Sequence, residues 1–128
     1  MTLSIRGVHL LLYSRTPEAD RAFFRDVLEL PSIDIGHGWM IFGLPPAEAA
    51  LHPTDAGAVG RDAGSGILGT SLYLMCDDVQ AFMRSLEARG VQCGPVTTER
   101  WGIATTIPLP SGGALGLYQP THPTALGL

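Results

Sequence analysis

"LYLMCDDVQAFMRSLEARGV", residues 72–91, decides the fold, because it passes from a strand pattern to a helix pattern within a few residues. Its first part is apolar and suits a buried strand. Its second part begins at an Asp pair that can cap a helix, and apolar side chains then recur at helical spacing. Gly90 supplies the residue at which many helices end. The stretch therefore predicts a strand followed by an amphipathic helix over 77–90.

The first half of the chain shows the same order of elements. A strand is expected at 4–13, and "RTPEADRAFFRDVLELP" then predicts a helix with Thr16 as N-cap and Pro17 in its first position. Pro31 should stop this helix. The motif "AFFR" at 22–25 is echoed by "AFMR" at 81–84, and such an internal repeat indicates a duplicated fold.

Further strand-like stretches follow each helix. In the first half they are "SIDI", "WMIFGL" and "AEAALH", and in the second half "VQCGPVT", "WGIATTIPL" and "ALGLYQP". The chain thus reads as one α+β domain over 1–128, built from two βαβββ modules at about 4–53 and 69–120. A Gly/Ala-rich loop at 54–68 is expected to join them.

Composition narrows the function classes. Of 128 residues, 45% are hydrophobic and 16% are charged, which indicates a globular chain. A net charge of −4 without a basic stripe excludes a nucleic-acid partner. No apolar stretch is long enough to span a membrane, and no targeting segment is recognisable. The two cysteines are not in a close ligand spacing, so we expect reduced thiols in a cytoplasmic protein.

The stretches "FFRDVLELP", "LYLMCDDVQAFMRSLEARGV" and "LPSGGALGLYQP" resemble the vicinal oxygen chelate superfamily, which includes glyoxalase I, bleomycin resistance proteins and extradiol dioxygenases. The resemblance covers nearly the whole chain. It implies that the two βαβββ modules form a curved eight-stranded cup and that the protein is a homodimer. In metal-using members, four strands each offer one ligand to a divalent ion in the cup.

The resemblance lets these four ligand positions be checked one at a time. His9 matches the first, and Glu48 matches the second unless the register places Ala50 there. The third position falls on Ser71, where members of the superfamily usually have His or Gln. The fourth falls on Gly116, where they usually have Glu. Two of the four positions therefore lack their usual ligand.

A displaced metal site is also disfavoured. His9, Glu48 and His52 could supply three ligands only if both residues of one strand reached the same ion. Side chains at i and i+4 of a strand are roughly 13 Å apart, which makes this arrangement unfavourable. We therefore expect neither the usual metal site nor another cofactor. If a divalent metal does bind, His9 and Glu48 are its candidate ligands.

Large aromatic side chains predict an organic ligand. Tyr73 lies two residues after Ser71, and Tyr118 two after Gly116, so each pair shares one face of its strand. Together with Trp101 they would line a cup that suits a flat or apolar molecule. Gly116 either leaves room for that molecule or relieves crowding in a curved sheet.

The histidines and Glu48 leave alternatives open. His9 is either a core histidine or a group that contacts the ligand as acid, base or hydrogen-bond donor. An unpaired buried carboxylate is costly, so Glu48 is either exposed or partnered, with His9 or His52 as natural partners. His37 and His122 are interpreted as loop residues.

The expected function is the binding of a small aromatic molecule without a metal, in the manner of the drug-sequestering members of the superfamily. The predicted ligand-binding residues are His9, Glu48, His52, Ser71, Tyr73, Trp101 and Tyr118. The alternative is an enzyme, either a glyoxalase-like lyase or isomerase or an extradiol-type dioxygenase, with His9 and Glu48 as catalytic residues. A third option is a subunit that has lost activity and is kept for assembly with a partner chain.

Overall fold

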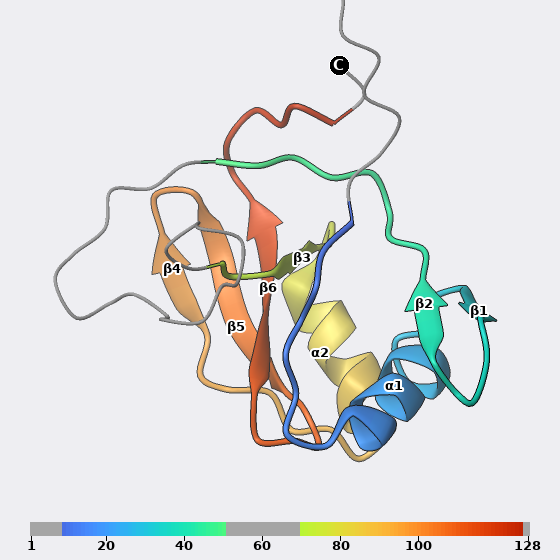
Figure 1. Cartoon of the computed structure of the whole chain (residues 1–128). Helices are drawn as coiled ribbons and strands as arrows, with labels where there is room; N and C mark the ends of the chain where they lie inside the picture. Colours follow the sequence, from blue (N-terminus) through green and yellow to red (C-terminus); the bar gives the residue numbers. More distant parts are fainter. Residues whose placement is uncertain (1–8, 51–69, 127–128) are drawn as a thin grey trace, which may run out of the picture.

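A computed structural model describes residues 9–50 and 70–126 of the chain. Within these residues two helices and six strands are arranged as a mixed α+β fold (Figure 1). The elements are, in chain order, α1 (Pro17–Asp26), β1 (Ser32–Asp34), β2 (Met40–Phe42), β3 (Tyr73–Met75), α2 (Val79–Glu87), β4 (Thr97–Glu99), β5 (Gly102–Pro108) and β6 (Ala114–Pro120).

The strands form two separate sheets. β1 and β2 make an antiparallel hairpin, and the other strands make a four-stranded sheet in the order β3-β6-β5-β4. In that sheet β3 runs parallel to β6, whereas the remaining neighbours are antiparallel. The last strand of the chain therefore lies between β3 and β5, near the middle of the sheet (Figure 1).

The two helices confirm the sequence prediction, with different capping. Asp78 caps α2, because its side chain accepts a hydrogen bond of 3.1 Å from the Ala81 N–H. Gly90 follows α2 with a φ of 80°, a left-handed conformation that glycine adopts without strain. Thr16 holds the N-cap position of α1, but its side chain makes no cap bond there. α1 ends at Asp26, well before Pro31.

The core lies between the helices and one face of the four-stranded sheet. On β6, Leu115 and Leu117 are buried on this face. On β5, Ile107 is fully buried beside them. The remaining members of the core cluster come from the helices and are Phe23, Phe24, Val79 and Leu86. Since side chains alternate along a strand, the residues between these positions point to the opposite face, away from α2.

Two expected strands differ from the structure. Residues 9–13 and 47–50 are not in strands, and the rest of both stretches lies outside the described residues. A strand needs a neighbour to satisfy its N–H and C=O groups, whereas Leu11 and Tyr13 are largely exposed. In the second half, the strand predicted from "VQCGPVT" at 91–97 is wrong for residues 91–96, because β4 begins at Thr97 and ends at Glu99.

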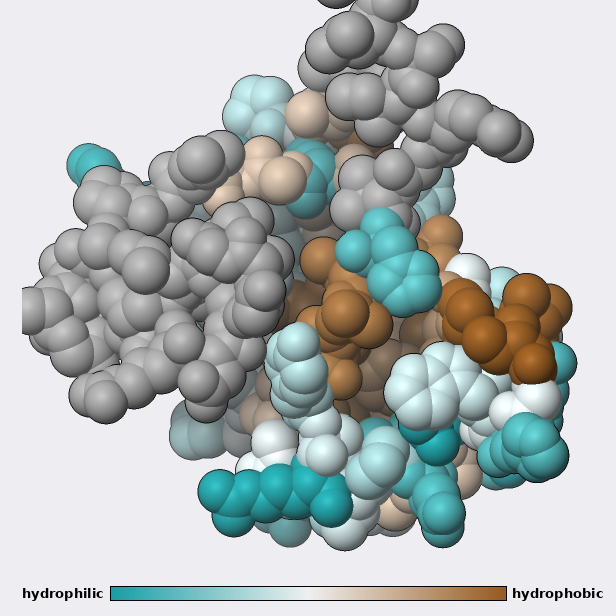
Figure 2. Space-filling model, in the orientation of Figure 1, coloured by the Kyte–Doolittle hydropathy of each residue, from teal (hydrophilic) through white to brown (hydrophobic). Residues whose placement is uncertain are grey.

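The expected linker at 54–68 lies outside the described residues. Figure 2 shows apolar side chains gathered on the surface of the N-terminal half. The large exposed apolar residues of this half are Leu10, Leu11, Leu12, Tyr13, Ile33, Ile35, Trp39 and Leu44. Neither of the helices in the described part of the chain is long and apolar enough to cross a membrane.

Candidate functional site

Three aromatic rings meet on the face of the four-stranded sheet that points away from α2. Tyr73 on β3, Trp101 in the turn between β4 and β5, and Tyr118 on β6 form what we call the aromatic cluster. Their ring centroids are 5.3 to 5.8 Å apart, and every pair meets edge to face. Such pairs attract each other because the positive edge of one ring meets the negative face of another. The structure thus brings together three residues that the sequence predicted for the ligand site.

Two glycines make room for these rings. A side chain on Gly116 would collide with the ring of Tyr73, its partner across β3 and β6. A side chain on Gly102 would lie 2.9 Å from Cδ2 of Tyr118. Gly116 therefore leaves space that Tyr73 already fills, which favours relief of crowding as its role.

The cluster is partly open to solvent. Tyr118 is buried at 8% exposure, whereas Tyr73 and Trp101 are 45% and 39% exposed. Tyr118 therefore forms the inner wall, and the two outer rings present aromatic surface to water. An exposed aromatic surface of this kind is costly to hydrate and can stack against a flat molecule.

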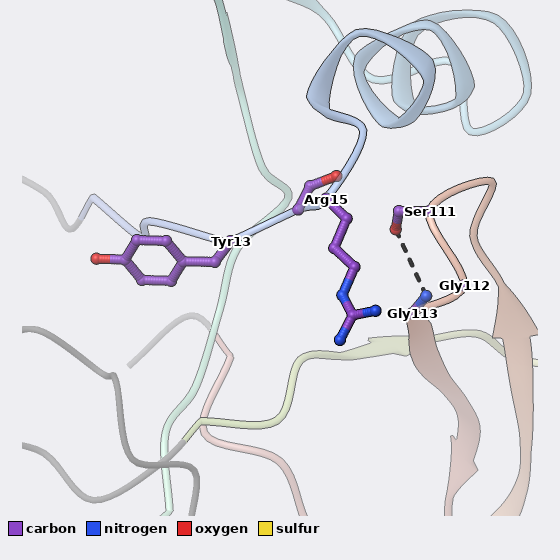
Figure 3. A pocket seen from close by; sticks show the side chains of 6 residues that line it. Tyr13, Arg15, Ser111, Gly112 and Gly113 are labelled. Carbon is purple, nitrogen blue, oxygen red and sulfur yellow. Dashed lines mark hydrogen bonds between the residues drawn. The ribbon is translucent and has the colours of Figure 1, made fainter.

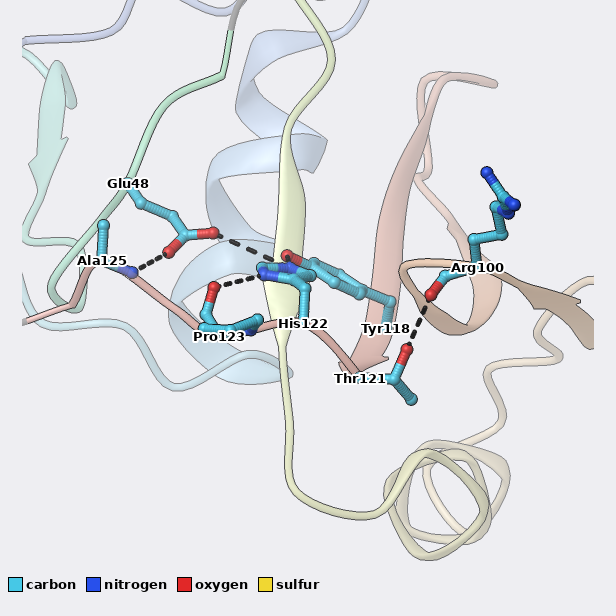
Figure 4. Close-up of polar contacts among 7 residues, drawn as sticks. All are labelled: Glu48, Arg100, Tyr118, Thr121, His122, Pro123 and Ala125. Carbon is cyan, nitrogen blue, oxygen red and sulfur yellow. Dashed lines mark hydrogen bonds and ion pairs between the residues drawn. The ribbon is translucent and has the colours of Figure 1, made fainter.

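A polar group adjoins the cluster at His122, two residues after β6 (Figure 4). The His122 ring stacks on Tyr118, with centroids 5.9 Å apart and planes 23° apart. His122 Nδ1 lies 2.7 Å from the carbonyl oxygen of Pro123, and its Nε2 lies 3.0 Å from the Tyr118 hydroxyl. Since a carbonyl can only accept, Nδ1 carries the proton. In the neutral imidazole, Nε2 therefore accepts the hydrogen bond from the Tyr118 O–H.

Glu48 approaches this group from the N-terminal half of the chain. Its Oε1 accepts a hydrogen bond of 2.7 Å from the Ala125 N–H, and its Oε2 lies 3.9 Å from His122 Nε2. Burial, and then the negative charge of Glu48, raise the pKa of the Tyr118 phenol. Tyr118 accordingly keeps its proton at neutral pH, as its hydrogen bond to His122 requires.

His122 is the functional candidate that sequence reasoning missed. The sequence offered His9 or His52 as partners of Glu48, but the structure places His122 there. The spacing of four residues from Tyr118, in a segment bounded by prolines, was the available signal. It is a weak signal, because the contact depends on how the tail turns after β6.

The remaining predicted site residues are exposed or lie outside the described residues. His9 is exposed at the start of the described residues, and Ser71 is exposed just before β3. His52 lies outside the described residues. His37 occupies a turn with a φ of 55° between two glycines, as a loop residue can.

The residues present do not provide a metal site in the part of the chain that the structure describes. No three His, Cys, Asp or Glu side chains among residues 9–50 and 70–126 gather closely enough to hold an ion. The thiols of Cys76 and Cys93 are free, and burial raises the pKa of each.

A hollow of about 410 Å³ lies where residues 13–15 face the turn between β5 and β6 (Figure 3). Tyr13 and Arg15 line one side, and Ser111 and its two following glycines line the other. The turn's amides are already used, because the Ser111 N–H donates to Asp20 and the Gly113 N–H to Ser111 Oγ. The Ser111 and Gly113 amides are therefore not available to a ligand in this hollow.

Comparison with known proteins identifies the fold. No protein-family model matches the sequence, and no curated protein matches it. Among solved structures, an antibiotic binding protein, TnmS3 from Streptomyces sp. CB03234, superposes with a TM-score of 0.64 at 21% identity, covering 94% of this chain and 100% of that one. The lactoylglutathione lyase from Agrobacterium tumefaciens superposes with a TM-score of 0.57 at 20% identity, covering 84% and 88%. The chain therefore shares the fold of these two proteins, in agreement with the fold that its sequence resemblance implied.

Proposed function

We propose that this protein binds a small, flat aromatic molecule against the aromatic cluster, without the metal ion that many proteins of this fold use. One observation carries the proposal, namely that Tyr73 and Trp101 present exposed ring surface around a buried Tyr118. A flat ligand that stacks on these rings removes their surface from water and gains contacts worth about 0.5–1.5 kcal/mol per ring pair beyond the area buried.

The polar group beside the cluster supports a binding role. Ligand sites combine apolar walls with a few placed polar atoms that fix the orientation of the ligand. Here Glu48, His122 and the Tyr118 hydroxyl supply those atoms at one end of the cluster. The similarity in fold to TnmS3, described as an antibiotic binding protein, is consistent with this role. His9, His52 and Ser71 stay predictions for the same site.

The proposal includes a second copy of the chain. The exposed apolar side chains of the N-terminal half make an unusually apolar surface for a monomer. We propose that the two βαβββ modules of one chain, at about 4–53 and 69–120, form a curved eight-stranded cup. We also propose that the protein is a homodimer in which the second copy covers this apolar surface. We also propose a cytoplasmic location, where the thiols of Cys76 and Cys93 would stay reduced.

Binding can be tested with acridine, a flat aromatic molecule, by isothermal titration calorimetry. We expect the Trp101→Ala variant to lose most of the affinity, because it removes one exposed ring of the cluster. Trp39→Ala is the matched control, since Trp39 is also exposed, at 55% against 39% for Trp101, but lies beside β2 and contacts Arg21. Equal affinities in all three proteins, or no binding to any, would refute the proposal.

The competing enzyme function makes a different prediction. A glyoxalase-like lyase or a dioxygenase of this fold would need a bound divalent metal for its chemistry. Elemental analysis of protein purified without chelator should then find about one ion per chain or per dimer site. We expect no stoichiometric metal. If such a metal is found, and if its removal abolishes acridine binding, the enzyme function would be favoured.

A further inference from the structure

We propose that the site selects a flat aromatic ligand that carries a positive charge or N–H donors, and that Glu48 and the Tyr118 oxygen recognise them. This inference rests on the proposed function and names the chemical class of its ligand. It follows from the directions of the hydrogen bonds at the polar end of the aromatic cluster (Figure 4).

The side chains at this end present acceptors. The proton on His122 Nδ1 is committed to the Pro123 carbonyl, 2.7 Å away. The proton of the Tyr118 hydroxyl is committed to His122 Nε2, so the Tyr118 oxygen offers only its lone pairs to a ligand. Glu48 is a carboxylate, which accepts hydrogen bonds and cannot donate them. A ligand that meets these groups therefore has to supply the donor.

Donors on the neighbouring backbone are also occupied. The Thr121 N–H donates to the Trp101 carbonyl, and the Thr121 hydroxyl donates to the Arg100 carbonyl. The Ala125 N–H donates to Glu48 itself. Pro123 has no N–H to offer. The tail after β6 thus closes the polar end without adding a free donor at these positions.

The local charge points to the same ligand. The Glu48 side chain is only 20% exposed, so its charge is less screened than that of a surface carboxylate. The Arg100 guanidinium points away from Glu48 and does not neutralise it (Figure 4). Aromatic faces attract cations, so the exposed rings of Tyr73 and Trp101 add to the preference. The net charge of −4 acts in the same direction over longer distances.

Three molecules with one ring frame separate these effects. At about pH 8, where an ordinary imidazole is neutral, 9-aminoacridine is a cation, acridine is neutral and acridine-9-carboxylate is an anion. Their affinities for the full-length protein can be compared by isothermal titration calorimetry. We expect 9-aminoacridine to bind at least about tenfold more tightly than acridine, because a hydrogen bond to a charged group contributes that much or more. We expect the anion to bind most weakly.

Glu48→Gln is the decisive variant. Its side-chain oxygen can still accept the hydrogen bond from the Ala125 N–H, so the tail should stay in place. We expect the preference for 9-aminoacridine over acridine, measured as the ratio of their affinities within each protein, to fall to about twofold or less in this variant. Glu18→Gln removes the same charge from an exposed position at the start of α1 and should keep the preference.

The outcomes distinguish the inference from the proposed function. If acridine binds through Trp101 but the cation has no advantage, or keeps its advantage in Glu48→Gln, the inference is wrong and the binding function stands. If none of the three molecules binds, both are wrong. If the anion binds best, the hydrogen-bond directions assigned to Tyr118 and His122 are wrong.

Discussion

Replacing Gly116 with alanine should open the aromatic cluster. The new Cβ would lie 2.6 Å from Cγ of Tyr73 and closer still to two other carbons of that ring. Gly116 sits in a paired strand, so its backbone cannot easily move, whereas the Tyr73 ring is half exposed. We therefore expect the ring to swing into solvent and leave Trp101 and Tyr118.

The size of the effect follows from the contacts that are lost. Tyr73 makes two edge-to-face contacts, and each is worth about 0.5–1.5 kcal/mol, or about 2 kcal/mol together. Alanine also lowers the entropy of the unfolded chain, which offsets about 0.4–1 kcal/mol. The free energy of unfolding should therefore fall by about 1 kcal/mol in Gly116→Ala.

Gly113→Ala provides the matched control in the same hairpin. A Cβ there meets no atom closer than 3.6 Å, so only the entropic gain should remain. Urea unfolding followed by circular dichroism measures both variants. The control should exceed Gly116→Ala in free energy of unfolding by about 2 kcal/mol. Equal stabilities for the two variants would refute the packing assigned to Tyr73.

Further predictions concern the helix caps and the thiols. Asp78→Ala should lower the free energy of unfolding by about 1 kcal/mol, whereas Thr16→Ala should change it little because Thr16 makes no side-chain cap bond; equal losses in urea titrations would contradict this difference. Since burial raises the pKa of Cys76 and Cys93, both should react with iodoacetamide more slowly than glutathione at neutral pH, and rates matching glutathione would count against it. Because folding raises the pKa of both thiols, their contribution to the free energy of unfolding is fully present below the ordinary thiol pKa and is lost as the pH rises through the pKa of the folded protein. When both cysteines are replaced by serine, the free energy of unfolding should therefore fall less at alkaline pH.

The second half of the chain could be predicted well from its sequence. The capping Asp78, the apolar spacing of α2 and the stop at Gly90 are local signals, and all three are present in the structure. Period-two alternation also placed Tyr73 on the face of Ser71 and Tyr118 on the face of Gly116, and the family resemblance implied that both faces line one cup. In the structure Tyr73 and Gly116 are partners across β3 and β6.

The polar end of the site could not be predicted in the same way. The Glu48 contact to Ala125 joins residues 77 positions apart, and no local pattern encodes such a separation. His122 follows a strand in an irregular tail, where its direction depends on bonds such as that from Thr121 to Arg100.

The strand expected at 4–13 illustrates the opposite problem. Its alternation was suitable, but residues 9–13 have no neighbouring strand among the described residues with which to pair.

The central claim is that a flat ligand stacks on the aromatic cluster, and the indole N–H signals test it most directly. The chain has two tryptophans, so a ¹⁵N–¹H spectrum should contain two such signals, assigned with a Trp39→Phe variant. On addition of acridine we predict that the Trp101 signal shifts in a saturable way while the Trp39 signal stays in place. A shift of Trp39 alone, or of neither signal at saturating acridine, would contradict the account.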